Sequence, residues 1–205
     1  SNTTGHNNVS IGCFALGANT EGVSNVAIGY RTLDANTTAD CIVAIGAFAL
    51  TSNTTGPNNT AVGTEALGDN TTGSGNAALG NYALSCNTDG YNNTGLGNAA
   101  LLKNTTGDMN TAVGHDALAC NTTASGNTAV GQDAMRINTT GTANVAVGCG
   151  ALICNTTGSN HTAVGRNSLG DNTTSSSNSA FGGNSLASNT TGNFNTALGY
   201  DALLL

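Results

Sequence analysis

The side chains able to do acid–base, nucleophilic or metal chemistry in this chain are three histidines, six cysteines and eleven carboxylates. His6, His115 and His161 are widely separated and stand at three different positions of a seventeen-residue repeat that runs through the chain. They therefore predict no shared metal site. The carboxylates recur in no fixed pair, and the chain holds no phosphate-binding G-x-x-x-x-G-K-[ST], no G-x-S-x-G and no H-E-x-x-H motif. We expect a protein that is not an enzyme and has no catalytic, cofactor-binding or metal-binding residues.

The cysteines could act only as thiols or disulfides. Cys86, Cys120 and Cys154 occupy the same position in alternate copies of the repeat. If copies stack about 4.8 Å apart, these residues lie about 9.6 Å from one another, beyond the roughly 7 Å limit on the Cα separation of a disulfide. We expect small, partly buried free thiols, with bonds between chains left open as the alternative.

These residues belong to a repeat that is clearest at Asn104–Cys120, which reads N-T-T-G-D-M-N-T-A-V-G-H-D-A-L-A-C. Twelve copies of seventeen residues cover residues 2–205 without a gap, and we number the columns 1 to 17 from the Asn that opens each copy. Columns 1, 2 and 11 are always Asn, Thr and Gly, column 10 is always large and apolar, and column 15 is Leu except at Met135. A fixed short period is the signature of stacked repeats, so we expect one domain over residues 2–205.

The chemistry of each copy excludes a helix. Glycine recurs in columns 4 and 11, and β-branched residues recur in columns 2, 3 and 8, which both disfavour helix. Columns 8–10 alternate in size, as a short strand does when columns 8 and 10 share one face and column 9 points the other way. We predict an all-β parallel β-solenoid of twelve seventeen-residue coils.

Stacking identical copies creates ladders of identical residues. We expect columns 10 and 15 to fill the coil interior and column 1 to form an asparagine ladder that passes amide hydrogen bonds from coil to coil. The core ladder is represented by Ile28, Val62, Val113, Val147, Leu67, Leu118 and Leu152. The asparagine ladder is represented by Asn53, Asn70, Asn104 and Asn121.

Columns 9 and 14 stay small in every copy, although column 9 should point away from that interior. A position held small along a whole face suggests that another backbone packs closely against it. We therefore expect an inter-chain face, represented by Ala61, Ala112, Ala129 and Ala146. The alternative is a flattened coil in which these residues are also interior.

Composition excludes several partners. Only 7% of residues are charged and the net charge is −7, so four scattered cations cannot form the basic stripe that a nucleic acid requires. No run of about 18 apolar residues exists to span a bilayer. We expect neither nucleic-acid binding nor membrane insertion.

The strings N-V-A-I-G at Asn25–Gly29 and N-T-A-V-G at Asn59–Gly63 and Asn110–Gly114 resemble the core motif of trimeric autotransporter adhesin heads. The longer pattern N-T-T-G-x-x-N-T-A-V-G-x-x-A-L is similar to repeats of phage and bacterial tail-fibre-like proteins. The resemblance implies a left-handed β-roll whose chains pack side by side, although the adhesin repeats are usually shorter.

We therefore expect the structural shaft of an extracellular fibre, at a cell surface or on a virion, whose partners are copies of itself joined laterally as a trimer or end to end as a filament. An alternative is an adhesin module that binds glycans or a cell surface, for which the aromatics Phe14, Phe48 and Tyr82 of column 13 are not contiguous in sequence. A second alternative is an ice-binding solenoid with threonine ranks from columns 2 and 3. N-x-[ST] sequons in column 1 leave glycosylation open, but the asparagine ladder explains that column without sugar.

Overall fold

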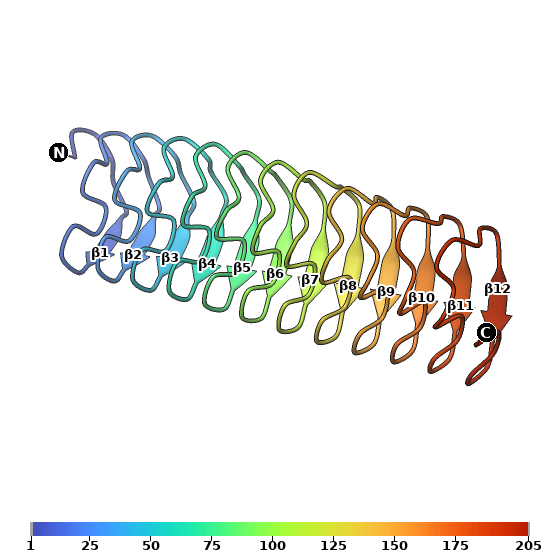
Figure 1. Cartoon of the computed structure of the whole chain (residues 1–205). Coiled ribbons are helices and arrows are strands. Elements are labelled where there is room, and N and C mark those ends of the chain that lie inside the picture. Colours follow the sequence, from blue (N-terminus) through green and yellow to red (C-terminus); the bar gives the residue numbers. More distant parts are fainter. Residues whose placement is uncertain (1, 205) are drawn as a thin grey trace.

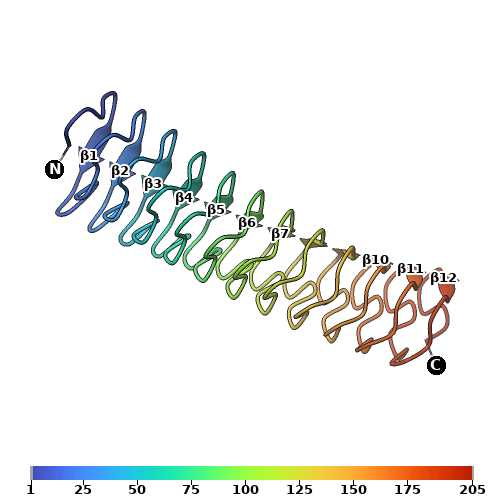
Figure 2. The ribbon, with the colours of Figure 1, turned by 90° about the horizontal axis from the view of Figure 1, so that it is seen from above.

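The computed structural model describes residues 2–204, and these form one straight rod with the termini at opposite ends (Figures 1 and 2). Each repeat contributes one three-residue strand, and no helix occurs in the described residues. The twelve strands form a single sheet in chain order. Their bounds are Val9–Ile11 (β1), Val26–Ile28 (β2), Val43–Ile45 (β3), Thr60–Val62 (β4), Ala77–Leu79 (β5), Thr94–Leu96 (β6), Thr111–Val113 (β7), Thr128–Val130 (β8), Val145–Val147 (β9), Thr162–Val164 (β10), Ser179–Phe181 (β11) and Thr196–Leu198 (β12).

Every strand pairs in parallel with the same columns of the next copy. β7 pairs with β8 in the register Thr111↔Thr128, Ala112↔Ala129 and Val113↔Val130, and the other pairs follow the same rule. Identical columns therefore lie above one another along the rod. This confirms the all-β parallel solenoid with one coil per repeat, and at about 4.8 Å per coil the rod is about 55 Å long.

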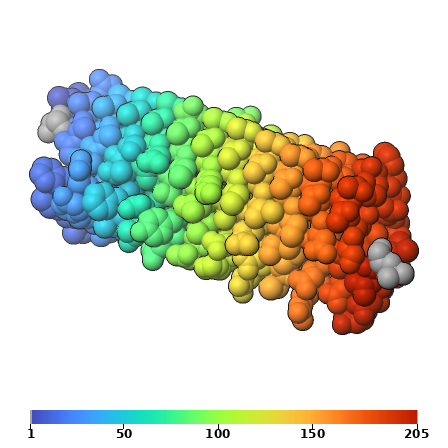
Figure 3. Space-filling view, in the orientation of Figure 1, coloured from blue at the N-terminus to red at the C-terminus, as the bar shows by residue number. Residues whose placement is uncertain are grey.

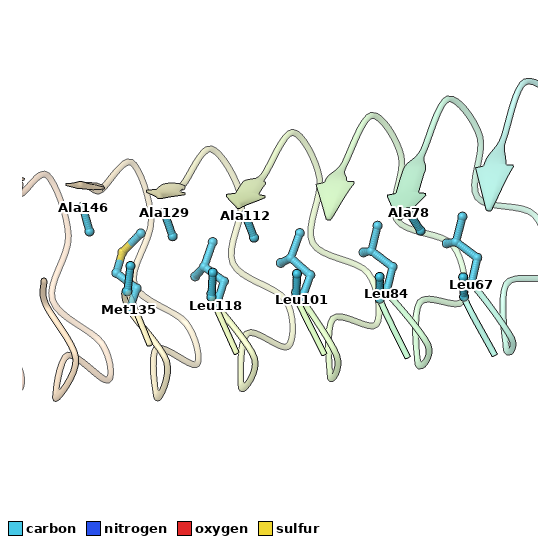
Figure 4. Packing of buried hydrophobic residues seen from close by; sticks show 14 of the residues in the cluster. Leu67, Ala78, Leu84, Leu101, Ala112, Leu118, Ala129, Met135 and Ala146 are labelled. Atoms are coloured by element: carbon cyan, nitrogen blue, oxygen red, sulfur yellow. The ribbon is translucent and has the colours of Figure 1, made fainter. Parts of the chain in front are cut away.

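The coil interior is narrow and is filled from two sides. The leucines of column 15 point inward from the turn segment, and the alanines of column 9 point inward from the strand, so that they face each other across the coil (Figure 4). A Cβ placed on Gly95, the one glycine in column 9, would lie 3.4 Å from Leu84 Cδ1, which is ordinary contact distance. With a leucine already on one side, a methyl group is what fits on the other side.

The expectation for column 15 is confirmed and the expectation for column 10 is wrong. Leu67, Leu118 and Leu152 are fully buried in the core. Ile28, Val62, Val113 and Val147 are only half-buried, because columns 8 and 10 point out of the coil while column 9 points in. The alternation predicted for columns 8–10 is present, but its inward face carries the small residue.

The inter-chain face expected in column 9 is therefore also wrong. Ala61, Ala112, Ala129 and Ala146 have no exposed surface and belong to the core of the single chain, so no neighbouring chain can reach them. The flattened-coil alternative is the correct one. These alanines stay small because the interior is thin.

The turns depend on backbone conformations that few residues adopt. Columns 6, 13 and 15 have φ near +50° to +60° in coil after coil, including at the buried leucines Leu67 (φ 51°) and Leu118 (φ 51°). Column 11 is glycine throughout because its φ is near +130° and a Cβ there would collide with the column 11 carbonyl of the next coil, for example at 2.6 Å for Gly114. A left-handed conformation costs a non-glycine residue about 1–2 kcal/mol, which burial of the leucine side chain offsets.

Two asparagine ladders connect the coils. In column 1, Asn104 Nδ2 donates to Asn87 Oδ1 at 2.8 Å and Asn121 Nδ2 donates to Asn104 Oδ1 at 2.8 Å, and the same bond joins Asn70 to Asn53 at 2.7 Å. In column 7, each asparagine accepts the backbone N–H of the next one, as Asn110 Oδ1 does from Asn127 at 3.0 Å. The column 1 ladder predicted from the sequence is confirmed.

Candidate interaction surfaces

The first candidate surface is the outward side of the sheet, which we call the strand face and which consists of columns 8 and 10 of β1 to β12. Its column 10 residues are aliphatic or aromatic, and its column 8 residues are Val, Thr, Ala or Ser. Between β3 and β11 the most exposed of these apolar residues are Ile45, Leu79, Leu96, Val145 and Phe181, each 37–41% exposed. A regular apolar stripe of this kind on a protein surface marks an interaction site.

The strand face is flat and periodic because every coil presents the same two columns at the same height. No charged residue occurs in either column in any of the twelve copies. Charged side chains usually interrupt the surface of a protein that does not associate. Their absence makes this face suited to contact with another regular surface.

The second candidate surface is the turn edge, formed by columns 12 and 13, which follow the glycine of column 11. These two columns are the most variable part of the repeat and hold aromatic, acidic, basic and histidine residues. Column 13 has positive φ in every coil from Phe14 to Asp201, with Gly150 taking the same conformation. A constant backbone therefore displays changing side chains along one edge of the rod.

One group on the turn edge brings a histidine next to two carboxylates. The ligand atoms of His115, Asp116 and Asp133 lie within 4.8 Å of one another. Asp116 Oδ2 is 3.4 Å from His115 Nδ1, and Asp133 Oδ1 is 3.5 Å from Arg136 Nε. The contacts with His115 and Arg136 thus account for the positions of the two half-buried carboxylates.

A hollow of about 350 Å³ lies farther along the same edge, and it is lined by Phe14, Tyr30, Arg31 and Asp34. The Tyr30 ring packs edge-on against Phe48, with centroids 5.3 Å apart and an interplanar angle of 88°. The column 12 aromatic of one coil thus packs on the column 13 aromatic of the next coil and lines the hollow together with the column 13 aromatic of the coil before it. The structure thus brings together aromatic residues of columns 12 and 13, which are not recognised as neighbours when column 13 is considered alone.

The asparagine and threonine ladders are occupied by the fold itself. Column 1 is buried from Asn19 to Asn172, and each amide of this stretch bonds within the coil stack. The packed ladder leaves no room for a glycan on these asparagines. In column 2 each threonine hydroxyl donates to the column 2 carbonyl of the next coil, as Thr105 does to Thr122 at 3.0 Å.

His161 replaces asparagine in the buried column 7 ladder. Its Nδ1 accepts the Asn178 backbone N–H at 3.2 Å, and its Nε2 lies 2.7 Å from the Ser175 carbonyl oxygen and 3.1 Å from Asn172 Nδ2. The acceptor role of Nδ1 and the short contact with a carbonyl oxygen both place the proton on Nε2. Burial lowers the pKa of His161, and the backbone contacts to Ser175 and Asn178 only partly oppose this. The residue serves as a substitute for asparagine in the fold.

The six cysteines are free thiols, but the expectation that they are partly buried is correct only for Cys86, Cys120 and Cys154, because Cys13, Cys41 and Cys149 are exposed. Cys86 and Cys154 are half-buried, and burial raises the pKa of each thiol, with Asp69 and Asp171 respectively adding to the effect. A raised pKa reduces the thiolate fraction and with it the reactivity of the thiol. Their environment is that of packing residues.

The sequence predicts neither the outward strand face nor the groups of the turn edge, although it does single out the column 13 aromatics Phe14, Phe48 and Tyr82. The alternation of columns 8–10 allows either face to be interior, and only the distance across the coil decides between them. The turn-edge groups join residues of adjacent columns in adjacent copies, such as Tyr30 with Phe48, or Asp116 with Asp133. Reading columns in pairs rather than singly would have found them.

Comparison with known proteins gave no match to a family model, to a curated protein or to a solved structure. Among residues 2–204, no helix is long and apolar enough to cross a membrane.

Proposed function

We propose that this chain is the non-enzymatic structural shaft of an extracellular fibre, in which copies pack side by side through their strand faces. The observation that carries the proposal is the unbroken row of aliphatic and aromatic residues in column 10 of the strand face, on a rod whose interior is already complete. The alanines and leucines of columns 9, 14 and 15 satisfy the core without help from columns 8 and 10. The outward aliphatic residues are therefore surplus to the fold of the single chain.

The size of the strand face fits a side-by-side contact. Twelve strands stacked about 4.8 Å apart and about 10 Å wide give a strip of roughly 550 Å² per copy. Flanking columns add to this, and a standard interface buries roughly 800 Å² per partner. The resemblance of the N-T-A-V-G motif to trimeric adhesin heads supports the same arrangement.

Periodicity makes the contact suitable for a fibre. Because every coil presents the same two columns, two rods can slide by one coil and still match apolar residue to apolar residue. Staggered contacts of this kind join rods into particles longer than a single chain. Lateral packing alone is thus sufficient to build a filament.

A charge-placement experiment tests the proposal. The variant Val113→Glu/Val130→Glu places two carboxylates on the strand face of β7 and β8. The control Thr106→Glu/Thr123→Glu places two carboxylates in the same coils on column 3, where Glu21 occurs naturally and the side chains are exposed. Sedimentation equilibrium gives the mass of each, and circular dichroism checks that the β structure is retained.

We expect the unmodified chain and the column 3 control to sediment as multiples of 20.1 kDa, and the strand-face variant to sediment as a monomer. A buried carboxylate without a partner is costly, so two of them suffice to break the interface. An unmodified chain that stays monomeric at about 100 µM, where even a weak specific interface would form, overturns the proposal. A strand-face variant that keeps the mass of the assembled unmodified chain also overturns the proposal.

Ice binding is not favoured by any contact. The column 2 hydroxyls donate within the ladder, which leaves column 3 as the exposed threonine rank. Column 10 of the strand face changes from Val to Leu to Phe along the rod. A measurement of thermal hysteresis separates this function from the shaft, because a shaft produces none.

A further inference from the structure

We propose that the hollow lined by Phe14, Tyr30, Arg31 and Asp34 on the turn edge is a binding site for a neutral saccharide. This goes beyond the shaft function and does not rest on it, because the turn edge and the strand face are built from different columns.

The hollow has the size and walls of a small-ligand site. Its volume of about 350 Å³ lies at the lower end of the roughly 300–1,000 Å³ of ligand clefts, which suits a mono- or disaccharide. Phe14 is 61% exposed and Tyr30 is 47% exposed. These rings offer apolar faces to the C–H groups of a pyranose ring, and the Tyr30 hydroxyl adds a donor and an acceptor.

A second aromatic ring packs against Tyr30 from one side. Phe48, one coil beyond Tyr30, contacts the Tyr30 ring edge to face at 5.3 Å. Such a pair restricts the orientation of Tyr30 before a ligand arrives, which lowers the entropy lost on binding. Arg31 and Phe48 both have positive φ, which the repeat imposes on column 13 of every coil.

The polar wall is an ion pair held in place. Arg31 Nε and Nη2 both lie 3.1 Å from Asp34 Oδ2. The other carboxylate oxygen lies over Gly17, where a Cβ would be only 2.5 Å from Asp34 Oδ1. A guanidinium carries five N–H donors and a carboxylate accepts several hydrogen bonds, so the pair retains capacity for hydroxyl groups.

The charge balance selects the ligand class. The carboxylate of Asp34 would repel a phosphate or carboxylate ligand, and the guanidinium of Arg31 would repel an ammonium ligand. The ion pair therefore favours neither charged class. A neutral ligand that combines hydroxyl groups with an apolar face uses all four residues. Sugars have this combination.

Affinity electrophoresis of the full chain tests the proposal, since the net charge of −7 carries the protein into a native gel. The gels contain a neutral polysaccharide (galactomannan, glucomannan, xyloglucan or soluble starch), and an acidic one, polygalacturonate, serves as comparison. We expect at least one neutral polysaccharide to retard the protein. Tyr30→Ala and Arg31→Met should each weaken binding by about tenfold or more, equal to about 1.4 kcal/mol.

The controls are Tyr82→Ala and Tyr91→Ala, which remove equally exposed tyrosines (43% each) outside the hollow and should leave the retardation unchanged. The proposal is overturned if no neutral polysaccharide retards the protein, if only polygalacturonate does, or if the control variants lose binding as Tyr30→Ala does. The mass of Tyr30→Ala by sedimentation should equal that of the unmodified chain. Loss of saccharide binding is thereby distinguished from failure of the shaft to assemble.

Discussion

At the scale of single residues, each column 7 asparagine holds two coils together. Asn110 Nδ2 donates to the Ala124 carbonyl at 2.8 Å, and Asn110 Oδ1 accepts the Asn127 N–H at 3.0 Å. Both backbone groups belong to the next coil and are buried with the ladder. The amide side chain is required because it combines one donor and one acceptor in the space of a short side chain.

Asn110→Ala should therefore be destabilising. It leaves the Asn127 N–H buried without its partner, whereas the Ala124 carbonyl keeps the hydrogen bond that Asn121 Nδ2 donates at 3.0 Å. We expect the free energy of urea unfolding to fall by about 1–3 kcal/mol. The control Asn98→Ala replaces an exposed asparagine one coil earlier and should change the free energy of unfolding by less than about 0.5 kcal/mol. A loss of similar size in both variants would contradict the role of the ladder.

His161 makes the same ladder sensitive to pH. Because its folded pKa lies below the ordinary value of 6.5, the unfolded chain binds more protons between these two values. Stability is thus fully present above about pH 6.5 and falls as the pH drops below it, by at most about 1.4 kcal/mol per pH unit. Protonation would place a proton on Nδ1 against the Asn178 N–H.

Unfolding measured from pH 7.5 down to pH 5 tests this second prediction. The unmodified chain should lose stability over that interval, and His161→Asn, which restores the usual residue of column 7, should lose much less. Parallel pH profiles for the two proteins would show that His161 is not the titrating group.

At the scale of one coil, stability comes from a two-sided interior. Leu118 is fully buried, whereas Val113 of the same coil is half-buried on the strand face. Leu118→Ala should cost about 2–5 kcal/mol, the usual range for a buried leucine. Val113→Ala should cost the isolated chain less than about 1.5 kcal/mol, since it removes fewer buried methyl groups.

These two variants are compared by thermal or urea unfolding at a concentration low enough to keep the chain monomeric. Leu118→Ala should be far less stable than Val113→Ala, because the side chains of column 15 point inward and those of column 10 point outward. Equal losses of stability in the two variants would indicate that column 10 is interior and would contradict the arrangement of the coil.

The sequence predicts the coil length, the strand position, the parallel register and the asparagine ladder, because each depends on identity between copies. It does not decide which face of columns 8–10 is inward, since alternation is symmetric between the two faces. That choice depends on the distance across the coil, which Leu84 and Gly95 reveal only when both are placed in space. The hollow at Tyr30 could not be predicted for a related reason, because its residues come from two coils and from columns 12, 13 and 16.

The left-handed turns are a further feature that composition hides. Columns 6, 13 and 15 contain Leu, Phe, Arg and Met at positive φ, residues that rarely favour this conformation. A single copy would not hold such a backbone. Stacking imposes it, because each turn donates backbone hydrogen bonds to the next coil, as Leu118 N does to Ala134 O at 3.0 Å.

At the scale of the whole molecule, each coil contacts only its neighbours, so stability grows coil by coil along the rod. The strand face runs unbroken along the described rod from β1 to β12, and Figure 3 shows the stacked coils as one continuous surface. An apolar stripe of this length on an uncharged face is the feature that connects the fold to the proposed fibre.

The most direct test of the central claim is the cross-section of the assembled particle by cryo-electron microscopy. The account predicts two or more rods side by side, with the strands of β1 to β12 at the contact and the turn edge outside. Single isolated rods, or rods that meet through the turn edge with their strand faces in solvent, would contradict it.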